Sequence, residues 1–432
     1  MGTDYVPTSR SGGEVSPPSG ATAAVGGEEG RAARWFWRFW LGSTISRVGD
    51  SVTLVALPLL AVLRLHATSF EVSLITAAGF CAWIVIGLPA GVVVNRLPLR
   101  GTQIAMDLIR GVALASLPVA AFLDALTLAQ VIAVALIVGF ATVIFDVGNS
   151  TFLPSIVPED ELVRRNSLVS GSDAGVQLGG PALGGVLVQS LGAPAGLLVD
   201  FVSYLASAAL LRSLPRPPAP HRGDAQAPLA TMIRVGLSYV VHHQVIRVCV
   251  LAATIINFVC GGLLALTTVY LVRALGASPG IVGIVVASEG AGALVGAAIT
   301  PRASARLGDA RTFRWATTVG ALAALFMPLA TGSLGLGLFA VGNAGFAGGT
   351  VVVSVLARTH RHRVVPRELL PRVMATVRFI SWGVIPLGAL ATGLAASTFG
   401  NREALWLLTL FSLLTPTVLW LGPMRRRIEL GQ

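Results

Sequence analysis

The chain has 432 residues, of which 54% are hydrophobic and only 12% are charged, and its mean hydropathy is +0.77. Soluble domains carry about 25% charged residues, so this composition excludes an ordinary soluble protein and predicts a membrane protein. The formal net charge is +11, but all 31 basic residues are arginines placed between apolar runs, which argues against a nucleic-acid-binding protein.

The N-terminal 30 residues are rich in Gly, Ser and Pro and contain no apolar run. We therefore predict that residues 1–30 are a disordered tail without a secretory signal peptide. Twelve apolar segments of spanning length follow, since about 20 helical residues cross the hydrocarbon of a bilayer. They lie near residues 41–63, 71–94, 103–123, 126–148, 168–190 and 194–214, and then near 245–271, 280–300, 313–332, 335–357, 373–398 and 403–423.

A Pro-rich polar stretch separates the sixth segment from the seventh and leads into residues 229–243, which alternate apolar and polar residues. This alternation predicts an amphipathic helix at the membrane surface. The predicted domains are an N-terminal bundle (31–214), a linker (215–243), a C-terminal bundle (244–423) and a C-terminal tail (424–432).

The arginines are distributed unevenly between the two sets of alternating loops. One set and its flanks hold 24 of them, whereas the other set holds only Arg64, Arg273 and Arg402. Because positive loops stay in the cytoplasm, we expect both termini and the linker to be cytoplasmic. The lack of Lys and the abundance of Ala and Gly favour a bacterial source, hence a multi-pass protein of the inner (plasma) membrane.

The segment from Val157 to Val186 has a second copy that begins at Val365, 208 residues later and without a gap. Both copies run from a charged loop into a Gly-rich apolar segment. Two similar units half a chain apart predict the parallel repeats of a transporter; the alternative is chance similarity between segments rich in Gly and Val. The identical pairs are Val157/Val365, Pro158/Pro366, Leu162/Leu370, Arg164/Arg372, Val169/Val377, Gly175/Gly383, Val176/Val384, Gly180/Gly388 and Gly185/Gly393.

The fifth segment contains a spaced set of small residues: Gly171 and, after eight residues, Gly180, Pro181, Gly184 and Gly185. Such residues let helix backbones approach closely, and a proline permits a bend. The pattern G-x8-G-P-x2-G-G resembles the antiporter motif of drug exporters of the major facilitator superfamily. The alternative is generic packing of small residues between helices.

The loop after the second segment contains Gly91, Asn95, Arg96 and Arg100. It resembles the superfamily's loop between spans 2 and 3, which acts there as a cytoplasmic latch between the two halves. Asn95 stands where the family usually has an acid, which puts the charge relay of the latch in doubt. Asp107 and Arg110, three residues apart near the start of the third segment, could supply a replacement acid.

A narrower resemblance covers most of residues 35–423. Motifs around Arg47 in the first segment, Met106 in the third and Trp382 in the eleventh look like the branch of macrolide-efflux proteins and enterobactin exporters. The resemblance implies an all-α membrane protein with twelve transmembrane helices in two pseudo-symmetric six-helix bundles, the major facilitator fold. It also implies a central cavity lined by spans 1, 4, 7 and 10.

These observations predict a secondary active transporter rather than an enzyme. No nucleophile–base pair, metal-ligand set or Walker-type loop stands out, so neither a cofactor nor ATP hydrolysis is expected. The expected function is proton-coupled export of amphipathic small molecules such as macrolide-like antibiotics, by a monomer in a lipid bilayer. The alternatives are a siderophore exporter of the same fold and a transport-inactive sensor or scaffold.

Charged groups inside a bilayer are costly and therefore need a reason. Asp50 and Glu289 lie near the middle of the first and eighth segments, so we predict a functional role for both and expect Arg47 to pair with Asp50. Asp50 is the expected proton-coupling carboxylate, with Glu289 as its rival. The charged residues placed nearer the segment ends are expected to make structural pairs or headgroup contacts, and these are Asp146, Asp173, Asp200 and Arg378.

Overall fold

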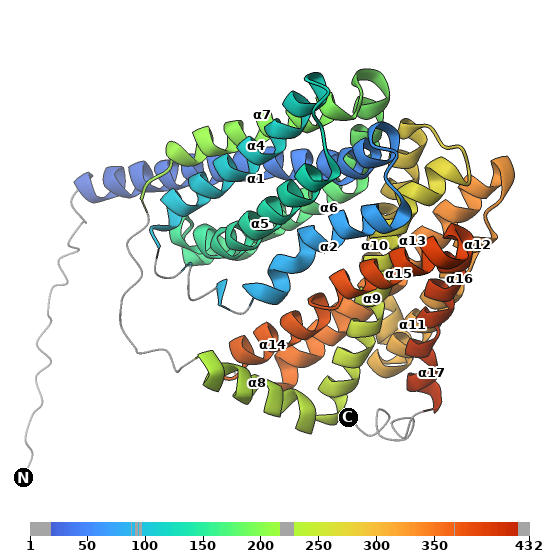
Figure 1. Ribbon diagram of the computed structural model, residues 1–432. Coiled ribbons are helices and arrows are strands. Elements are labelled where there is room, and N and C mark those ends of the chain that lie inside the picture. Colours follow the sequence, from blue (N-terminus) through green and yellow to red (C-terminus); the bar gives the residue numbers. More distant parts are fainter. Residues whose placement is uncertain are drawn as a thin grey trace, which may run out of the picture.

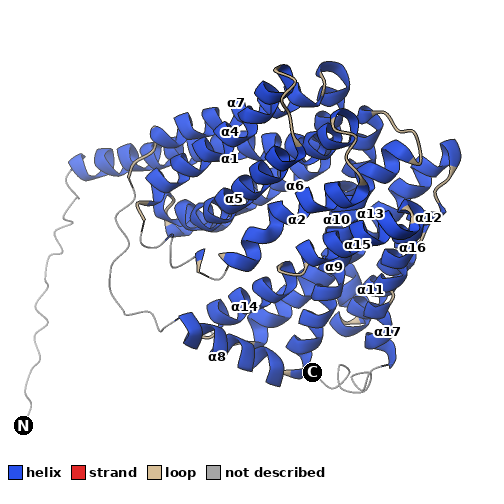
Figure 2. Ribbon diagram, in the orientation of Figure 1, coloured by secondary structure: helices blue, strands red, loops and turns tan. Residues whose placement is uncertain are grey.

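The computed structural model describes residues 19–87, 89–90, 94, 97–216, 229–366 and 368–421. Within these ranges the chain forms helices and short connections and no strand (Figure 2). The helices before the linker are α1 (Ser19–Arg64), α2 (Ser69–Val85), α4 (Leu99–Phe122), α5 (Leu128–Ile156), α6 (Glu159–Leu191) and α7 (Ala193–Arg212). The later helices are α8 (Leu229–His242), α9 (Gln244–Arg273), α10 (Pro279–Leu307), α11 (Asp309–Ala324), α12 (Phe326–Leu329), α13 (Gly332–Val364), α14 (Leu370–Trp382), α15 (Ile385–Phe399), α16 (Asn401–Ser412) and α17 (Leu414–Leu421).

Nine stretches of helix among the described residues are long and apolar enough to cross a membrane. α14 with α15, and α16 with α17, each form one such stretch. Three further predicted segments coincide with α2, α6 and α11, which fall short of the same limits of length and composition. The all-α membrane architecture is therefore confirmed, whereas the number twelve stays a prediction.

The two ends of the first half differ in how well they match the domain prediction. α1 begins at Ser19, so residues 19–30 are helical rather than a disordered tail, and residues 1–18 lie outside the described part. α8 forms within the predicted linker and packs on α14, where Gly236 lies against Thr376. The predicted C-terminal tail, 424–432, also lies outside the described residues.

The repeat of 208 residues reappears in the backbone. Gly192 joins α6 to α7 with a φ of 87°, and Gly400 joins α15 to α16 with a φ of 103°. These left-handed conformations favour glycine, which lacks the Cβ atom that would clash there. Val157 and Val365, also 208 residues apart, both directly follow the last residue of a helix, α5 and α13 respectively.

Helix packing follows the same repeat. A Cβ atom on Gly180 of α6 would lie 2.4 Å from the Cβ of Ser51 in α1, and one on Gly388 of α15 would lie 2.0 Å from the carbonyl oxygen of Phe258 in α9. Ser51 and Phe258 are themselves 207 residues apart. The two copies therefore make equivalent contacts in their own halves, which favours a true repeat over chance similarity.

Two seams join the halves, and Figure 1 shows α6 beside α10 and α2 beside α15. In the first seam, a Cβ atom on Gly185 would lie 2.7 Å from the Cα of Gly283. In the second, a Cβ atom on Gly393 would lie 2.4 Å from the Cβ of Ser73. These close approaches need glycine because a side chain would force the backbones apart.

We call the end that holds the connections at 65–68, 192, 274–278 and 400 the distal end, and the end that holds α8 the proximal end. Hydrogen bonds link the halves distally. An Arg273 Nη donates to the carbonyl of Ala67 (2.6 Å), and the Ser69 hydroxyl to the amide oxygen of Asn401 (2.6 Å). The backbone amide of Gly280 donates to the Gln189 side chain (2.9 Å). The halves are thus held together at the distal end.

The outer helix faces carry exposed apolar side chains. Val112, Val119, Phe122, Val202 and Leu334 are each more than half exposed, and many other Leu, Ile and Val side chains share this position. An apolar surface of this extent does not suit water and fits a lipid environment.

Candidate functional site

Asp50 lies on α1 in the middle of the apolar stretch Ala33–Arg64, and its side chain is 41% exposed. Its Oδ1 accepts a hydrogen bond of 2.5 Å from the Tyr204 hydroxyl of α7. An Arg110 Nη of α4 lies 3.8 Å from the same oxygen. One carboxylate oxygen is therefore held by two helices, while much of the side chain stays accessible.

Arg110 is almost completely buried beneath Asp50. It donates to the carboxylate of Asp107, which is fully buried, and its guanidinium lies 4.1 Å from the Phe145 ring centre and 4.3 Å from that of Tyr204. Removing one partner of a buried ion pair typically costs about 3–5 kcal/mol. Arg110 and Asp107 therefore form a fixed buried pair. Asp50 is the accessible acid of this cluster and the one that a ligand can reach.

Asp200 is a third acid next to this cluster, and it makes structural contacts, one of the two roles expected for the charged residues nearer the segment ends. It is fully buried on α7, where the hydroxyls of Thr53 and Ser203 donate to its carboxylate. Gly49 makes this possible, because a Cβ there would lie 2.2 Å from an Asp200 oxygen. The sequence Gly49-Asp50 thus lets α1 lie directly on the acidic face of α7.

The predicted pair of Arg47 with Asp50 is wrong. Arg47 instead forms an ion pair of 2.9 Å with Asp173 of α6, and both side chains are partly exposed. Arg47 pairs with α6, whereas Asp50 contacts α4 and α7, although residues three apart lie only about 60° apart around a helix. Asp173 therefore has a structural partner, as expected.

Glu289 lies on α10 at an exposed position, one residue before the Gly290 that packs on Leu178 of α6. Neither an ion pair nor a hydrogen bond joins its carboxylate to another described residue, although it interacts electrostatically with Cys260 of α9. Asp50 and Glu289 are thus not brought together in one ion-paired cluster. Asp50 has organised partners and Glu289 does not.

The predicted latch residues have different outcomes in the structure. Gly91, Asn95 and Arg96 lie outside the described residues. Arg100 donates to the carbonyl of Leu214 (2.6 Å), which belongs to the same half of the protein. The idea that Asp107 supplies the missing acid is wrong, because it is buried against Arg110 in the N-terminal half.

The small residues of α6 serve two interfaces. Gly180 and Gly184 face Ser51 and Val52 of α1, whereas Gly185 faces α10 of the other half. The carbonyl oxygen of Pro181 also contacts this seam at Gly283. A Cβ atom on Gly171 would lie in open space. The motif residues thus lie where close helix approach requires them, with Gly171 as the exception.

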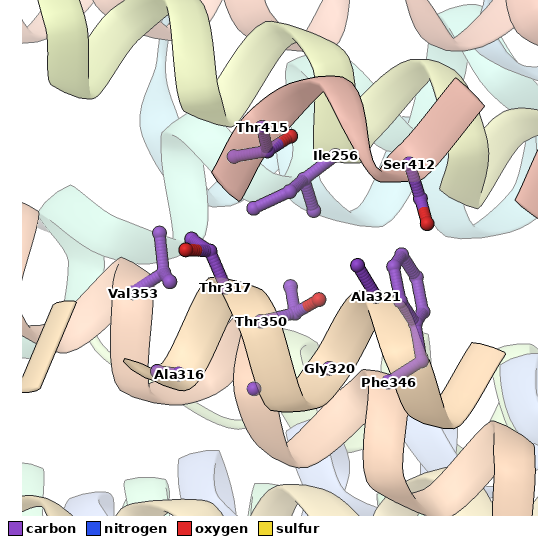
Figure 3. A pocket seen from close by; sticks show the side chains of 11 residues that line it. Ile256, Ala316, Thr317, Gly320, Ala321, Phe346, Thr350, Val353, Ser412 and Thr415 are labelled. Atoms are coloured by element: carbon purple, nitrogen blue, oxygen red, sulfur yellow. The ribbon is translucent and has the colours of Figure 1, made fainter. Parts of the chain in front are cut away.

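A small cavity inside the C-terminal half is shown in Figure 3. Its volume of about 10 Å³ has room for roughly one water molecule. The hydroxyls of Thr350 and Thr415 border it and lack hydrogen-bond partners among the described residues. It is too small for a drug-like substrate, so it is not part of the candidate transport site.

Two residues of the site, Tyr204 and Thr53, were not singled out from the sequence, and the burial of Asp200 was not predicted. A signal was present, because Asp200 and Tyr204 are four residues apart and so share one face of α7, as Gly49 and Thr53 do on α1. In apolar surroundings, polar side chains are expected to hydrogen-bond across neighbouring helices, and a small residue beside them lets the helices approach closely.

Comparison with known proteins identifies the relatives of this arrangement. A family model described as Major Facilitator Superfamily matches residues 39–362. The chain is similar to the multidrug efflux pump Tap of Mycolicibacterium fortuitum, with 25% identity over 89% of this chain and 94% of that protein. It is also similar to the uncharacterized MFS-type transporter YfiS of Bacillus subtilis (strain 168), with 26% identity over 60% of this chain and 62% of that protein.

Solved structures share the fold. A nucleoside transporter, NupG (D323A mutant), superimposes with a TM-score of 0.72 at 12% identity over 90% of this chain and 99% of that one. A bacterial homologue of the iron transporter ferroportin, in an inward-facing state, gives a TM-score of 0.67 at 16% identity over 90% and 98% of the two chains. At such identities the likeness concerns the fold alone.

Proposed function

Because the chain belongs to the Major Facilitator Superfamily, we propose that it is a proton-coupled exporter of amphipathic small molecules such as macrolide-like antibiotics. The resemblance to this superfamily is confirmed, and with it a multi-pass membrane transporter of small molecules. The similarity to a multidrug efflux pump over 89% of the chain supports the direction and the substrate class. Fold alone does not fix a substrate, so the site has to support the rest.

The observation that carries proton coupling is the unequal sharing of Arg110 between two acids. Asp107 is buried with Arg110, whereas Asp50 is 41% exposed in the middle of a membrane-spanning helix. Asp50 can therefore gain or lose a proton while the Arg110–Asp107 pair keeps its buried charges balanced. Tyr204 holds the Asp50 carboxylate in place by a hydrogen bond when neither a proton nor a substrate is bound to it.

Competition between a proton and the substrate for the Asp50 carboxylate would couple proton transport to substrate transport. A protonated Asp50 is neutral and attracts an organic cation weakly, whereas an ionised Asp50 attracts it strongly in a low-dielectric surrounding. Proton and cationic substrate then exclude each other, and each conformational cycle exchanges one for the other. Such differential binding to the two states is what a ligand needs to drive a transition.

A drug-susceptibility panel in an efflux-deficient bacterial host tests this function. We expect the wild-type protein to raise the inhibitory concentration of at least one amphipathic drug, with macrolides first, and Asp50→Asn at equal membrane abundance to return it to the empty-vector value. Resistance that is unchanged by the wild-type gene across cationic and neutral drugs would contradict the proposal, and equal protection by Asp50→Asn would contradict the role of Asp50.

We further propose that the proximal end faces the cytoplasm of a bacterial cell, with both termini on the cytoplasmic side of the inner membrane. The support is the arginine asymmetry, because Arg100, Arg311 and Arg363 lie proximally and few arginines lie distally. Reporter fusions after Arg100, Arg222 and Arg311 should give cytoplasmic signals, and a fusion after Ser278 an external one. A cytoplasmic signal after Ser278 would overturn this orientation.

A further inference from the structure

Arg378 lies where the second seam ends, and it touches both halves of the protein. Its guanidinium carbon is 4.1 Å from the ring centre of Trp83 on α2 and 4.6 Å from that of Trp382 on α14. The two indoles meet edge to face, with ring centres 4.8 Å apart. Arg378 was expected to lie shallowly and reach toward the headgroups, but its guanidinium lies against both aromatic rings instead.

Contacts along this seam can be followed from the distal end inward. Asn401 meets Ser69, Gly393 meets Ser73, and Trp382 meets Trp83. Trp83 is 14 residues beyond Ser69, which corresponds to about 21 Å along a helix. The aromatic pair therefore lies well inward along the contacts between α2 and the helices α14 and α15, near the depth of the charged cluster.

An acid on α5 interacts both with Arg378 and with that cluster. Asp146 of α5 interacts electrostatically with Arg378 across the seam and with Asp50 and Arg110 in its own half. Among the described residues no direct ion pair links Asp146 to Arg378, so the guanidinium is held by the rings and attracted by the acid. The interior acids of the N-terminal half outnumber its interior arginines, being Asp50, Asp107, Asp146, Asp173 and Asp200 against Arg47, Arg110 and Arg165.

We propose that Trp83, Trp382 and Asp146 form a binding site for an organic cation, and that Arg378 fills this site until a substrate cation displaces it. The proposal rests on the proposed export of small molecules and names their charge. Arg378 occupies the place of the substrate cation, because its guanidinium is a delocalised, weakly hydrated cation on a long flexible side chain. The faces of two indoles with an acid nearby are the surroundings that attract quaternary ammonium and similar ligands.

The chemistry of the site selects among cations. Small metal ions prefer oxygen ligands and are not expected to leave water for an indole face. A large organic cation loses little hydration and gains contact with both rings. Because one ring belongs to each half, a ligand in this site contacts α2 and α14 at the same time.

Binding of tetraphenylphosphonium to the purified full-length protein in lipid nanodiscs, measured by isothermal titration calorimetry, tests the proposal. In Arg378→Ala the competing guanidinium is absent, so we expect about tenfold tighter binding than in wild type. Arg378→Lys should be intermediate, because a more strongly hydrated ammonium competes less well for an indole face. Adding Trp83→Ala to Arg378→Ala should remove the gain.

Arg314→Ala is a matched control. Arg314 lies 5.0 Å from the ring centre of Trp420, which itself meets Trp315 edge to face, but this group lies inside the C-terminal half. We expect its substitution to leave tetraphenylphosphonium affinity unchanged. Ethylguanidinium added to Arg378→Ala should compete with the probe, since it restores the missing group.

Unchanged or weaker binding by Arg378→Ala would overturn the proposal, as would a gain that persists without Trp83. If Arg378→Ala does not give a monodisperse protein, the intermediate affinity of Arg378→Lys and its loss on adding Trp83→Ala decide in the same way. The assay uses no proton gradient, so it can succeed where proton coupling fails. Drug export with a failed binding test would leave the proposed function standing and remove the cation site.

Discussion

Replacing Gly185 with leucine is expected to lower drug export by about 100-fold while the protein still reaches the membrane. A Cβ atom at this position would lie 2.7 Å from the Cα of Gly283 and 2.6 Å from the carbonyl oxygen of Pro279. Both contacts are backbone atoms, which cannot move aside as a flexible side chain can. Overpacking typically costs about 1–3 kcal/mol, and at the upper end the population of the distally closed state falls by about that factor.

The same motif supplies the control for this experiment. Gly171 has no atom within 4 Å of its notional Cβ, so Gly171→Leu should keep wild-type export at equal abundance. Export is measured as the rate of drug efflux from preloaded cells. Normal efflux by Gly185→Leu would mean that the α6–α10 seam does not have to close during transport, and a defect in Gly171→Leu would mean that leucine in α6 harms the protein for another reason.

The all-α membrane architecture could be predicted from composition and apolar runs because a bilayer leaves few choices, whereas the major facilitator fold was implied by the family resemblance. Apolar runs of about 20 residues have to become helices, since backbone groups find no other hydrogen-bond partners in lipid. The repeat from Val157 and Val365 also showed in advance which helices would be equivalent, and Gly192 and Gly400 later took the same backbone conformation. The start of α1 at Ser19 was missed because a tail rich in Gly and Ser has low helix propensity.

The site could be predicted only in part, because partners on different helices depend on how each helix is rotated. Asp50 was singled out by its depth, and depth follows from position along one helix. Its pairing with Arg47 was wrong, since spacing along α1 shows which residues are neighbours but not which helix each one faces. The complete burial of Asp200 was not predicted for a related reason, because the glycine that admits it, Gly49, lies on another helix.

The latch interpretation shows the limit of a motif whose partners are far away in the chain. Asp107 and Arg110 are three residues apart and close to the loop, which made them plausible substitutes for an acid at Asn95. In the structure both face inward, where Tyr204 and Phe145 enclose the guanidinium. Aromatic residues on α5 and α7 thus decide the role of a pair on α4.

Loss of proton-driven transport in Asp50→Asn is the second large effect that we expect. Asparagine keeps the shape of the side chain and can still accept from Tyr204, but it cannot take up or release a proton. Arg110 keeps its buried partner Asp107, so the protein should fold. Glu289→Gln is the comparison, because Glu289 is equally deep but makes neither an ion pair nor a hydrogen bond with the described residues, and we expect it to retain pH-driven transport.

The most direct measurement uses proteoliposomes that contain purified protein and the drug with the strongest response in the susceptibility panel. With an imposed pH gradient, wild-type protein should move the drug against its concentration, and a protonophore should stop this movement. Asp50→Asn, reconstituted as folded protein at the wild-type amount, should transport no faster than protein-free liposomes. Undiminished movement by Asp50→Asn under the pH gradient would contradict proton exchange at Asp50.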